Sequence, residues 1–353
     1  MEFPEGDISL LVDNFIYEFD KVFGKYLSKE ELMKRLEENM GEIKFNFFNN
    51  GLEHFMGRYN ASDKSIEIPN TSSQGQLTSA FFYQMMHYVT VNQMRYHSTD
   101  NQPLQTSREV SYNQNPNIGF NEAFIQYATH LRDYEFDDVY DYDCTDVYFA
   151  SGKLLRNISR IYGEDEFLMD AFNNPSIFLS GQSENKSLEI SDEFDVLYQA
   201  EDEFRSNPNF IMDFLYSMTQ KKAPKQESVE KAKLSLLKKV MKMTDERANP
   251  TTSMEFDFLC STLCNLLSHM DIEHALSIAD LEILARKAAE INISPEETKK
   301  IICNNDLIPR DIEKGINIEE ATKSALLSGV LPEDMLGIPQ QDEKDKDKLT
   351  IIR

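Results

Sequence analysis

The interpretation of this chain starts from one stretch, Ser79-Ala80-Phe81-Phe82-Tyr83-Gln84-Met85-Met86-His87-Tyr88-Val89. Apolar residues return every three or four positions along it, and this spacing predicts an amphipathic α-helix. Its broad apolar side consists of Leu77, Phe81, Phe82, Met85, Tyr88 and Val89. Tyr83 and His87 fall on another side, four residues apart, so their side chains are expected to lie one turn apart on the same face.

A second helix is predicted from Asn121 to about Arg132. Asn121 is a favourable N-cap residue, and the charge of Glu122 suits the first turn of a helix. The apolar face of this helix consists of Phe124, Tyr127 and Leu131, whereas Glu122, Gln126 and Thr129 point elsewhere. Each of the two helices therefore offers one face to a core and a second face that carries polar groups.

Composition excludes some classes of partner. The 353 residues carry a formal net charge of −25, and 41% of them are hydrophobic, which is enough for two modest domains. An acidic surface repels phosphate backbones and anionic lipids, so neither nucleic acid nor a membrane is expected as the main partner. The sequence shows no signal-peptide pattern and no apolar run of membrane-spanning length, so a cytoplasmic location is expected.

The four cysteines form no C-x-x-C pair. Cys260 and Cys264 are one helical turn apart among leucines, so we expect buried free thiols rather than a metal or redox pair. This usage agrees with a reducing compartment.

Three parts are expected along the chain, at residues 1–180, 181–335 and 336–353. The first combines helices with a short strand, Ser65-Ile66-Glu67-Ile68-Pro69, whose alternating β-branched pattern is typical of strands. The second is helical, and the third is a charged tail expected to be disordered. The predicted fold class is therefore mainly α, with an α+β N-terminal half. The long polar segment 92–117 is interpreted as a functional lid or an insertion.

Taken together, residues 45–175 resemble the gluzincin-type H-E-x-x-H metallopeptidases, especially uncharacterised bacterial members. The matching pieces are the Ser65–Pro69 strand, Tyr83-Gln84-Met85-Met86-His87-Tyr88 and Gly119-Phe120-Asn121-Glu122-Ala123-Phe124-Ile125-Gln126-Tyr127. In such enzymes two histidines at i and i+4 hold zinc, the Glu after the first is the base, and a second helix supplies the third ligand. The resemblance implies a zincin-like domain in which a strand precedes the active-site-like helix.

The sequence departs from the family at the positions that carry the chemistry. Tyr83 occupies the first ligand position, and a phenol with a reference pKa of about 10 is a poor zinc ligand at neutral pH. Gln84 occupies the position of the base, and an amide cannot shuttle a proton. His87 and Glu122 remain as a vestigial metal pair, where catalytic zinc needs three protein ligands. No catalytic residue and no cofactor are therefore expected; His97 or His130 could complete a zinc site only through an unusual geometry.

Three functions are compatible with these residues. The favoured one is a catalytically inactive metallopeptidase-like protein that binds a peptide or protein partner or has a regulatory role. The second is an active zinc-dependent hydrolase with a rearranged site. The third is an acidic helical interaction protein unrelated to peptidases, in which His87 and Glu122 have structural roles alone.

Overall fold

The computed structural model of the chain describes residues 5–40, 44–48, 58–60, 65–69, 74–95, 117–140, 150–179, 181, 185–186, 188–206, 224–272 and 276–307. The chain forms two compact units, Met1–Val240 and Met241–Arg353. The predicted domain boundary at residue 180 is not tested by this division and stays a prediction.

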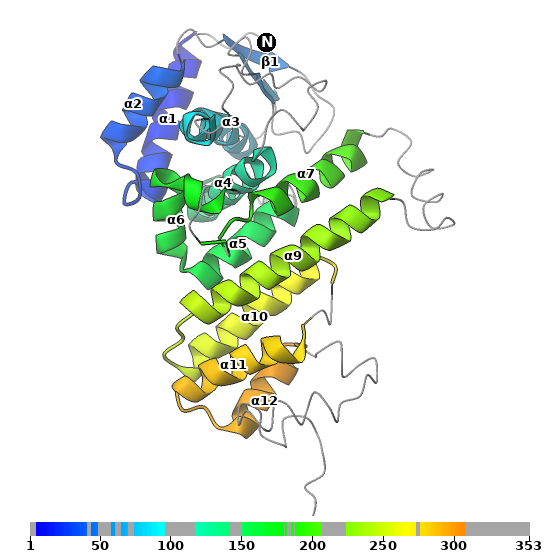
Figure 1. The fold of residues 1–353 in the computed structure, drawn as a ribbon. Helices are drawn as coiled ribbons and strands as arrows, with labels where there is room; N and C mark the ends of the chain where they lie inside the picture. The colour runs from blue at the N-terminus through cyan, green and yellow to red at the C-terminus, as the bar shows by residue number, and fades with distance from the viewer. Residues whose placement is uncertain are drawn as a thin grey trace, which may run out of the picture. The chain divides into compact units, whose positions relative to one another are not determined.

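Helices build most of the first unit (Figure 1). They are α1 (Glu5–Phe23), α2 (Lys29–Met40), α3 (Gln74–Arg95), α4 (Ile118–Tyr140), α5 (Ala150–Tyr162), α6 (Glu164–Asn173), the 3-10 helix η2 (Pro175–Phe178) and α7 (Ser191–Ser206). The helix α9 (Pro224–Arg247) begins in this unit. The pair α3 and α4 is central, because α1 packs on both helices, α2 on α3, and α5 and α7 on α4.

An aromatic cluster joins α1, α3, α4 and α6. The ring centroids of Phe15 and Phe82 are 5.1 Å apart, and Phe172 lies 5.6 Å from Phe19 and 5.2 Å from Phe124. These five side chains are at most 1% exposed. Tilted and edge-to-face ring pairs contribute roughly 0.5–1.5 kcal/mol each beyond the burial of their area. Phenylalanine therefore carries the core of this tryptophan-free chain.

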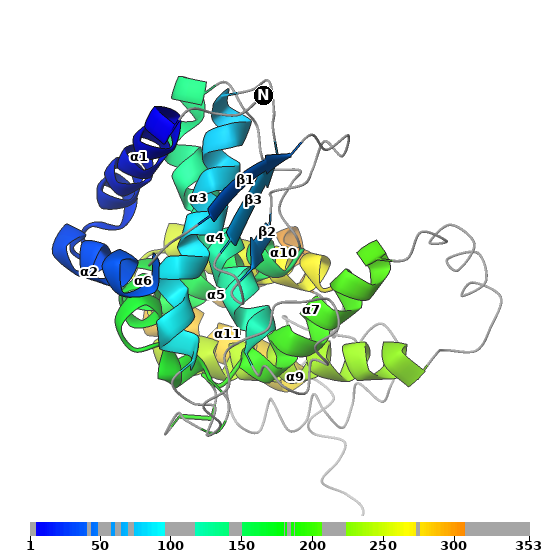
Figure 2. The same ribbon diagram turned by 90° about the horizontal axis from the view of Figure 1, so that it is seen from above.

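A small sheet lies beside α3 (Figure 2). Its strands are β1 (Lys44–Phe48), β2 (Arg58–Asn60) and β3 (Ser65–Pro69), in the order β1-β3-β2. The central strand β3 pairs parallel with β1 and antiparallel with β2. Ile66 and Ile68 alternate along β3 and are fully buried, which is the reason for the period-two pattern of this stretch.

The prediction of an α+β, zincin-like N-terminal half is wrong. The described part of the chain is mainly helical in both units, and the strands are only five, three and five residues long. The helices supply the large buried aromatic side chains of the core. The alternating pattern at Ser65–Pro69 predicted a local strand, but a local pattern does not show how small a share of the core that strand contributes.

The beginning of α4 is capped by another helix. The carboxylate of Asp195, on α7, accepts hydrogen bonds from the backbone N–H groups of Asn117 and Gly119, at 2.7 and 2.6 Å. Such N–H groups have no partner within their own helix. The helix thus begins at Ile118, and the prediction that Asn121 is its N-cap is wrong, because an acceptor distant in sequence takes that role.

Gly119 allows α7 to come this close. A Cβ atom on Gly119 would lie 2.3 Å from the carbonyl oxygen of Phe194 and 2.7 Å from the Cα of Asp195, both of which are backbone atoms. We expect Gly119→Ala to lower the free energy of unfolding by about 2–3 kcal/mol or more, because the two backbones must separate. Chemical denaturation followed by circular dichroism measures this change.

Gly152→Ala is the matched comparison for that variant. A Cβ atom on Gly152 would lie 2.7 Å from Cβ and 2.9 Å from Oε1 of Gln126, a less severe overlap than the 2.3 Å contact with a backbone oxygen at Gly119. The loss in Gly152→Ala should therefore be clearly smaller. Equal losses in the two variants would show that the close approach of α7 is not what requires Gly119.

The second unit contains α10 (Ser253–His269), α11 (Ile278–Glu290) and α12 (Pro295–Asn304). Each of these helices has a hydroxyl N-cap; that of α12 is Ser294, which accepts from the N–H of Glu297 at 3.2 Å. Cys260 is a buried free thiol, and burial raises its pKa to about 12, whereas Cys264 is partly exposed.

Some predictions fall on residues outside the described ranges. These are most of the polar segment 92–117, His97, and the tail at 336–353. Among the described helices, none has both the length and the apolar character needed to cross a membrane.

Candidate functional site

Helices α3 and α4 bring the three residues of the predicted metal positions together. The hydroxyl of Tyr83 donates a hydrogen bond to Oε2 of Glu122 at 2.6 Å. The Nε2 atom of His87 lies 3.7 Å from the other carboxylate oxygen, Oε1. The rings of Tyr83 and His87 meet edge to face, with centroids 5.5 Å apart. We refer to these residues as the Tyr83–Glu122–His87 cluster.

This cluster lies where α3 and α4 reach the surface. Between Leu77 and Thr90, His87 is the one residue that is not buried, and its side chain is 12% exposed. Glu122 is 14% exposed, and Asn121 beside it is also partly exposed. The Oδ1 atom of Asn121 is buried and has no hydrogen-bond partner in the described structure. A buried acceptor without a partner costs free energy of folding.

Burial determines the protonation of both rings. Burial, then the charge of Glu122 and the hydrogen bond to it, raise the pKa of Tyr83 well above its ordinary value. Burial lowers the pKa of His87, although the charge of Glu122 acts in the opposite direction. Tyr83 is therefore a neutral phenol at neutral pH, and His87 is a neutral imidazole.

Gln84 and His130 are the other candidates among the described residues. Neither makes the contacts that define the cluster. Gln84 follows Tyr83 directly, so its side chain points about 100° around the axis of α3 from that of Tyr83. Gln84 is 1% exposed. His130 lies two turns along α4 from Glu122, and its Nε2 atom is 2.5 Å from Nη1 of Arg156. His130 is therefore engaged with α5 instead of completing a ligand set.

Sequence reasoning missed the support that Gln126 provides. Its Oε1 atom accepts from the N–H of Gly152 at 3.2 Å and from the hydroxyl of Ser151 at 3.3 Å, in the first turn of α5. The side chain of Gln126 also acts to lower the pKa of Tyr83, though less strongly than burial raises it. Its position one turn after Glu122 was the available signal, because i and i+4 residues share a helix face.

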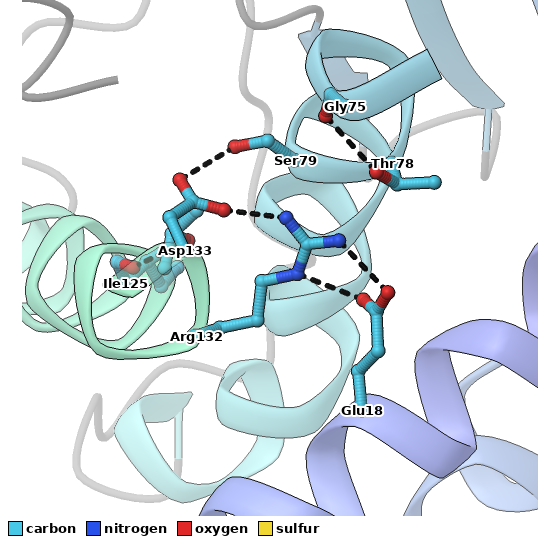
Figure 3. Close-up of polar contacts among 8 residues, drawn as sticks. Glu18, Gly75, Thr78, Ser79, Ile125, Arg132 and Asp133 are labelled. Atoms are coloured by element: carbon cyan, nitrogen blue, oxygen red, sulfur yellow. Dashed lines mark hydrogen bonds and ion pairs between the residues drawn. The ribbon is translucent and has the colours of Figure 1, made fainter. Parts of the chain in front are cut away.

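A buried ionic network holds the other end of the helix pair (Figure 3). Arg132 on α4 donates two hydrogen bonds to Glu18 on α1, at 2.8 and 2.9 Å. It donates a third to Asp133 at 2.5 Å, and Asp133 accepts from the hydroxyl of Ser79 on α3 at 2.8 Å. Ser79 lies on the same side of α3 as Tyr83. This network fixes α3 and α4 relative to α1, and with them the Tyr83–Glu122–His87 cluster.

The residues present do not fit a catalytic zinc ion. His87 and Glu122 supply two ligands, and the neutral phenol of Tyr83 is hydrogen-bonded to the carboxylate at the third position. In the part of the chain that the structure describes, no group of three or more His, Cys, Asp or Glu side chains is placed to hold a metal ion. The cluster can donate and accept hydrogen bonds, but it lacks the three metal ligands and the neighbouring base that zinc hydrolysis needs.

Comparison of the chain with models of protein families, with curated proteins and with solved structures gives no match.

Proposed function

We propose that this chain is a catalytically inactive relative of the H-E-x-x-H metallopeptidases that acts by binding a peptide or another protein. The observation that carries the proposal is the 2.6 Å hydrogen bond between Tyr83 and Glu122. Two positions that would share a metal in such an enzyme are joined directly instead. The hydrogen bond thus keeps α3 and α4 together without an ion.

The chemistry of the neighbouring groups argues against hydrolysis. Activation of water needs a base with a pKa near the working pH. The carboxamide of Gln84 cannot act as such a base. His87 is neutral, and Tyr83 keeps its proton. Loss of the ligand and of the base together removes both requirements for zinc hydrolysis.

The groups around the cluster support a binding role. His87, Asn121 and Glu122 are the partly exposed positions of two otherwise buried helix segments. Asn121 is partly exposed, and its side-chain amide can hydrogen-bond to the backbone carbonyl and N–H groups of a peptide. Peptide backbones carry one such donor at nearly every residue.

The test is a search for peptide ligands with the full chain, using an array of random extended peptides. We expect wild-type protein to select a subset of peptides. Asn121→Ala should weaken the binding of these peptides up to about tenfold, since a hydrogen bond contributes roughly 0.5–1.5 kcal/mol. Gln226→Ala, which removes an exposed carboxamide from α9, is the matched control and should bind like wild type.

Two outcomes would overturn this function. The first is the absence of any selected peptide, or equal binding by Asn121→Ala. The second is stoichiometric, sub-micromolar zinc binding to the wild-type protein in calorimetry, lost in His87→Ala. That second result would favour a hydrolase with a rearranged site.

A further inference from the structure

The carboxylate of Glu122 has neutral neighbours in the Tyr83–Glu122–His87 cluster. Its side chain is 14% exposed, and its Oε2 atom accepts from the neutral phenol of Tyr83 at 2.6 Å. The neutral imidazole of His87 lies 3.7 Å from Oε1. Within the described ranges, neither lysine nor arginine forms an ion pair with Glu122. This carboxylate is thus largely withdrawn from water, and its neighbours in the cluster do not neutralise it.

Other carboxylates of the protein interior are neutralised by a basic side chain. Among the described residues, each acidic side chain that is buried forms an ion pair at 2.5–2.9 Å. These pairs are Glu18 and Asp133 with Arg132, Glu189 with Lys186, and Glu193 with Lys239. A carboxylate that leaves water loses its hydration, and a neighbouring cation offsets that cost. Glu122 is only slightly more exposed than these four acids, so a cation from outside the chain would be stabilised beside it.

Glu122 keeps room for a further donor. An ionised carboxylate offers about four lone-pair positions, and the hydroxyl of Tyr83 uses one of them on Oε2. Oε1 lies beside His87, the residue of the Leu77–Thr90 stretch that is not buried. A side chain that approaches His87 from solvent therefore comes close to Oε1 as well. Coulomb attraction is stronger where the surroundings exclude water, so a cation gains more there than beside an exposed acid.

We propose that Glu122 binds an arginine side chain of the peptide or protein partner. A guanidinium is planar, presents several N–H donors to one carboxylate, and is more weakly hydrated than the ammonium group of lysine, which suits a site with little exposure. The formal net charge of −25 also favours the approach of a basic partner. This inference rests on the proposed peptide binding and gives the chemical class of the partner.

The test uses the full chain and the peptides that it selects from the array. We expect these peptides to contain arginine. Each is then prepared with citrulline, the uncharged isostere, in place of that arginine. Calorimetry should show that citrulline weakens binding to the wild-type protein about tenfold or more, because hydrogen bonds between two charged groups are roughly twice as strong as those between neutral groups.

Glu122→Gln identifies the group that recognises the charge. Its carboxamide oxygen can still accept from Tyr83, so the contact between α3 and α4 is retained. The arginine and citrulline peptides should bind this variant equally. Glu37→Gln is the matched control, because it removes the same charge from an exposed position of α2 in the same unit. It should keep the preference for arginine.

Proton NMR of His87 gives a readout in the wild-type protein, so the test stands even where Glu122→Gln fails to fold. The ring signals of His87 should shift when the arginine peptide binds, since its Nε2 atom lies 3.7 Å from the carboxylate that receives the guanidinium. These signals are assigned with His87→Gln. The citrulline peptide at the same concentration should shift them much less.

The outcomes separate this inference from the proposed function. Selected peptides without arginine, equal binding of the citrulline forms, or unmoved His87 signals would overturn the arginine site and leave peptide binding in place. The same holds for a preference for arginine that persists in Glu122→Gln, or that is lost in Glu37→Gln. Selection of no peptide at all would overturn the proposed function, and the arginine site with it.

Discussion

Replacement of Arg132 by methionine is expected to lower the free energy of unfolding by about 3–5 kcal/mol at neutral pH, because it leaves buried carboxylates without their cation. Arg132, Glu18 and Asp133 have side chains at most 4% exposed (Figure 3). Burial acts to lower the pKa of Arg132, but the hydrogen bonds to Glu18 and the charges of both acids raise it above its ordinary value. The guanidinium therefore stays charged, and the network depends on that charge.

Lys21→Met is the matched control for this variant. Lys21 and Glu135 join the same two helices, α1 and α4, at 3.0 Å, but their side chains are 43% and 48% exposed. Exposed pairs of this kind contribute roughly 0–1 kcal/mol. Urea denaturation of the two variants should thus differ by several kcal/mol, although each loses one cation between the same helices.

A double variant separates the loss of the ion pair between Arg132 and Glu18 from the cost of a buried carboxylate left without its cation. Arg132→Met combined with Glu18→Leu removes one of the orphaned carboxylates, so it should recover part of the stability lost in Arg132→Met. A loss in Arg132→Met no greater than that in Lys21→Met would contradict the role assigned to the network. An added loss in the double variant would show that Glu18 stabilises the fold through other contacts.

The meeting of Tyr83, His87 and Glu122 was predicted in two steps. The interval of four between Tyr83 and His87 places both on one face of a helix, and that rule holds in any fold. The family resemblance added the second helix and the position of Glu122 on it. Only the first step depends on spacing along one helix; the second depends on the resemblance, because spacing does not show which helices meet.

Contacts distant in sequence could not be obtained in the same way. Glu18 and Arg132 are 114 positions apart. Asp195 lies 78 positions after Asn117, whose N–H group donates to it. Neither acid differs in local pattern from the many others in a chain with 61 of them. The pairing of His130 with Arg156 was missed for another reason, because a histidine near a metal-like motif was considered only as a ligand.

The error in fold class has a different origin. The Ser65–Pro69 stretch was correctly interpreted as a strand, but a class depends on how much of the core each kind of element supplies. In this chain the aromatic side chains of helices such as α1, α3 and α4 fill that core. The family resemblance implied an α+β half on the basis of one short strand, whereas the described part of the chain is mainly helical.

Replacement of Tyr83 by histidine is expected to create a zinc site. The Nε2 atom of His87 and the Oε1 atom of Glu122 are 3.7 Å apart, close to the ~3.3 Å between two ligands on a tetrahedral zinc with bonds of about 2.0 Å. Imidazole is shorter than phenol, so the space of the Tyr83 hydroxyl, 2.6 Å from Glu122, becomes free for an ion. Calorimetric titration with zinc should give 1:1 binding with a Kd of about 1 µM or tighter, equivalent to roughly −8 kcal/mol.

Tyr83→Phe is the control for this gain, because it also removes the phenol but adds no ligand. It should bind no zinc in the same titration, and His87→Ala should abolish the binding that Tyr83→His acquires. Hydrolysis is not expected from Tyr83→His alone, since Gln84 still occupies the position of the base. A folded Tyr83→His protein that binds no zinc would show that α3 and α4 are not spaced for a metal. The proposed descent from H-E-x-x-H enzymes would then be contradicted, whereas the hydrogen bond between Tyr83 and Glu122 would remain a feature of the helix pair.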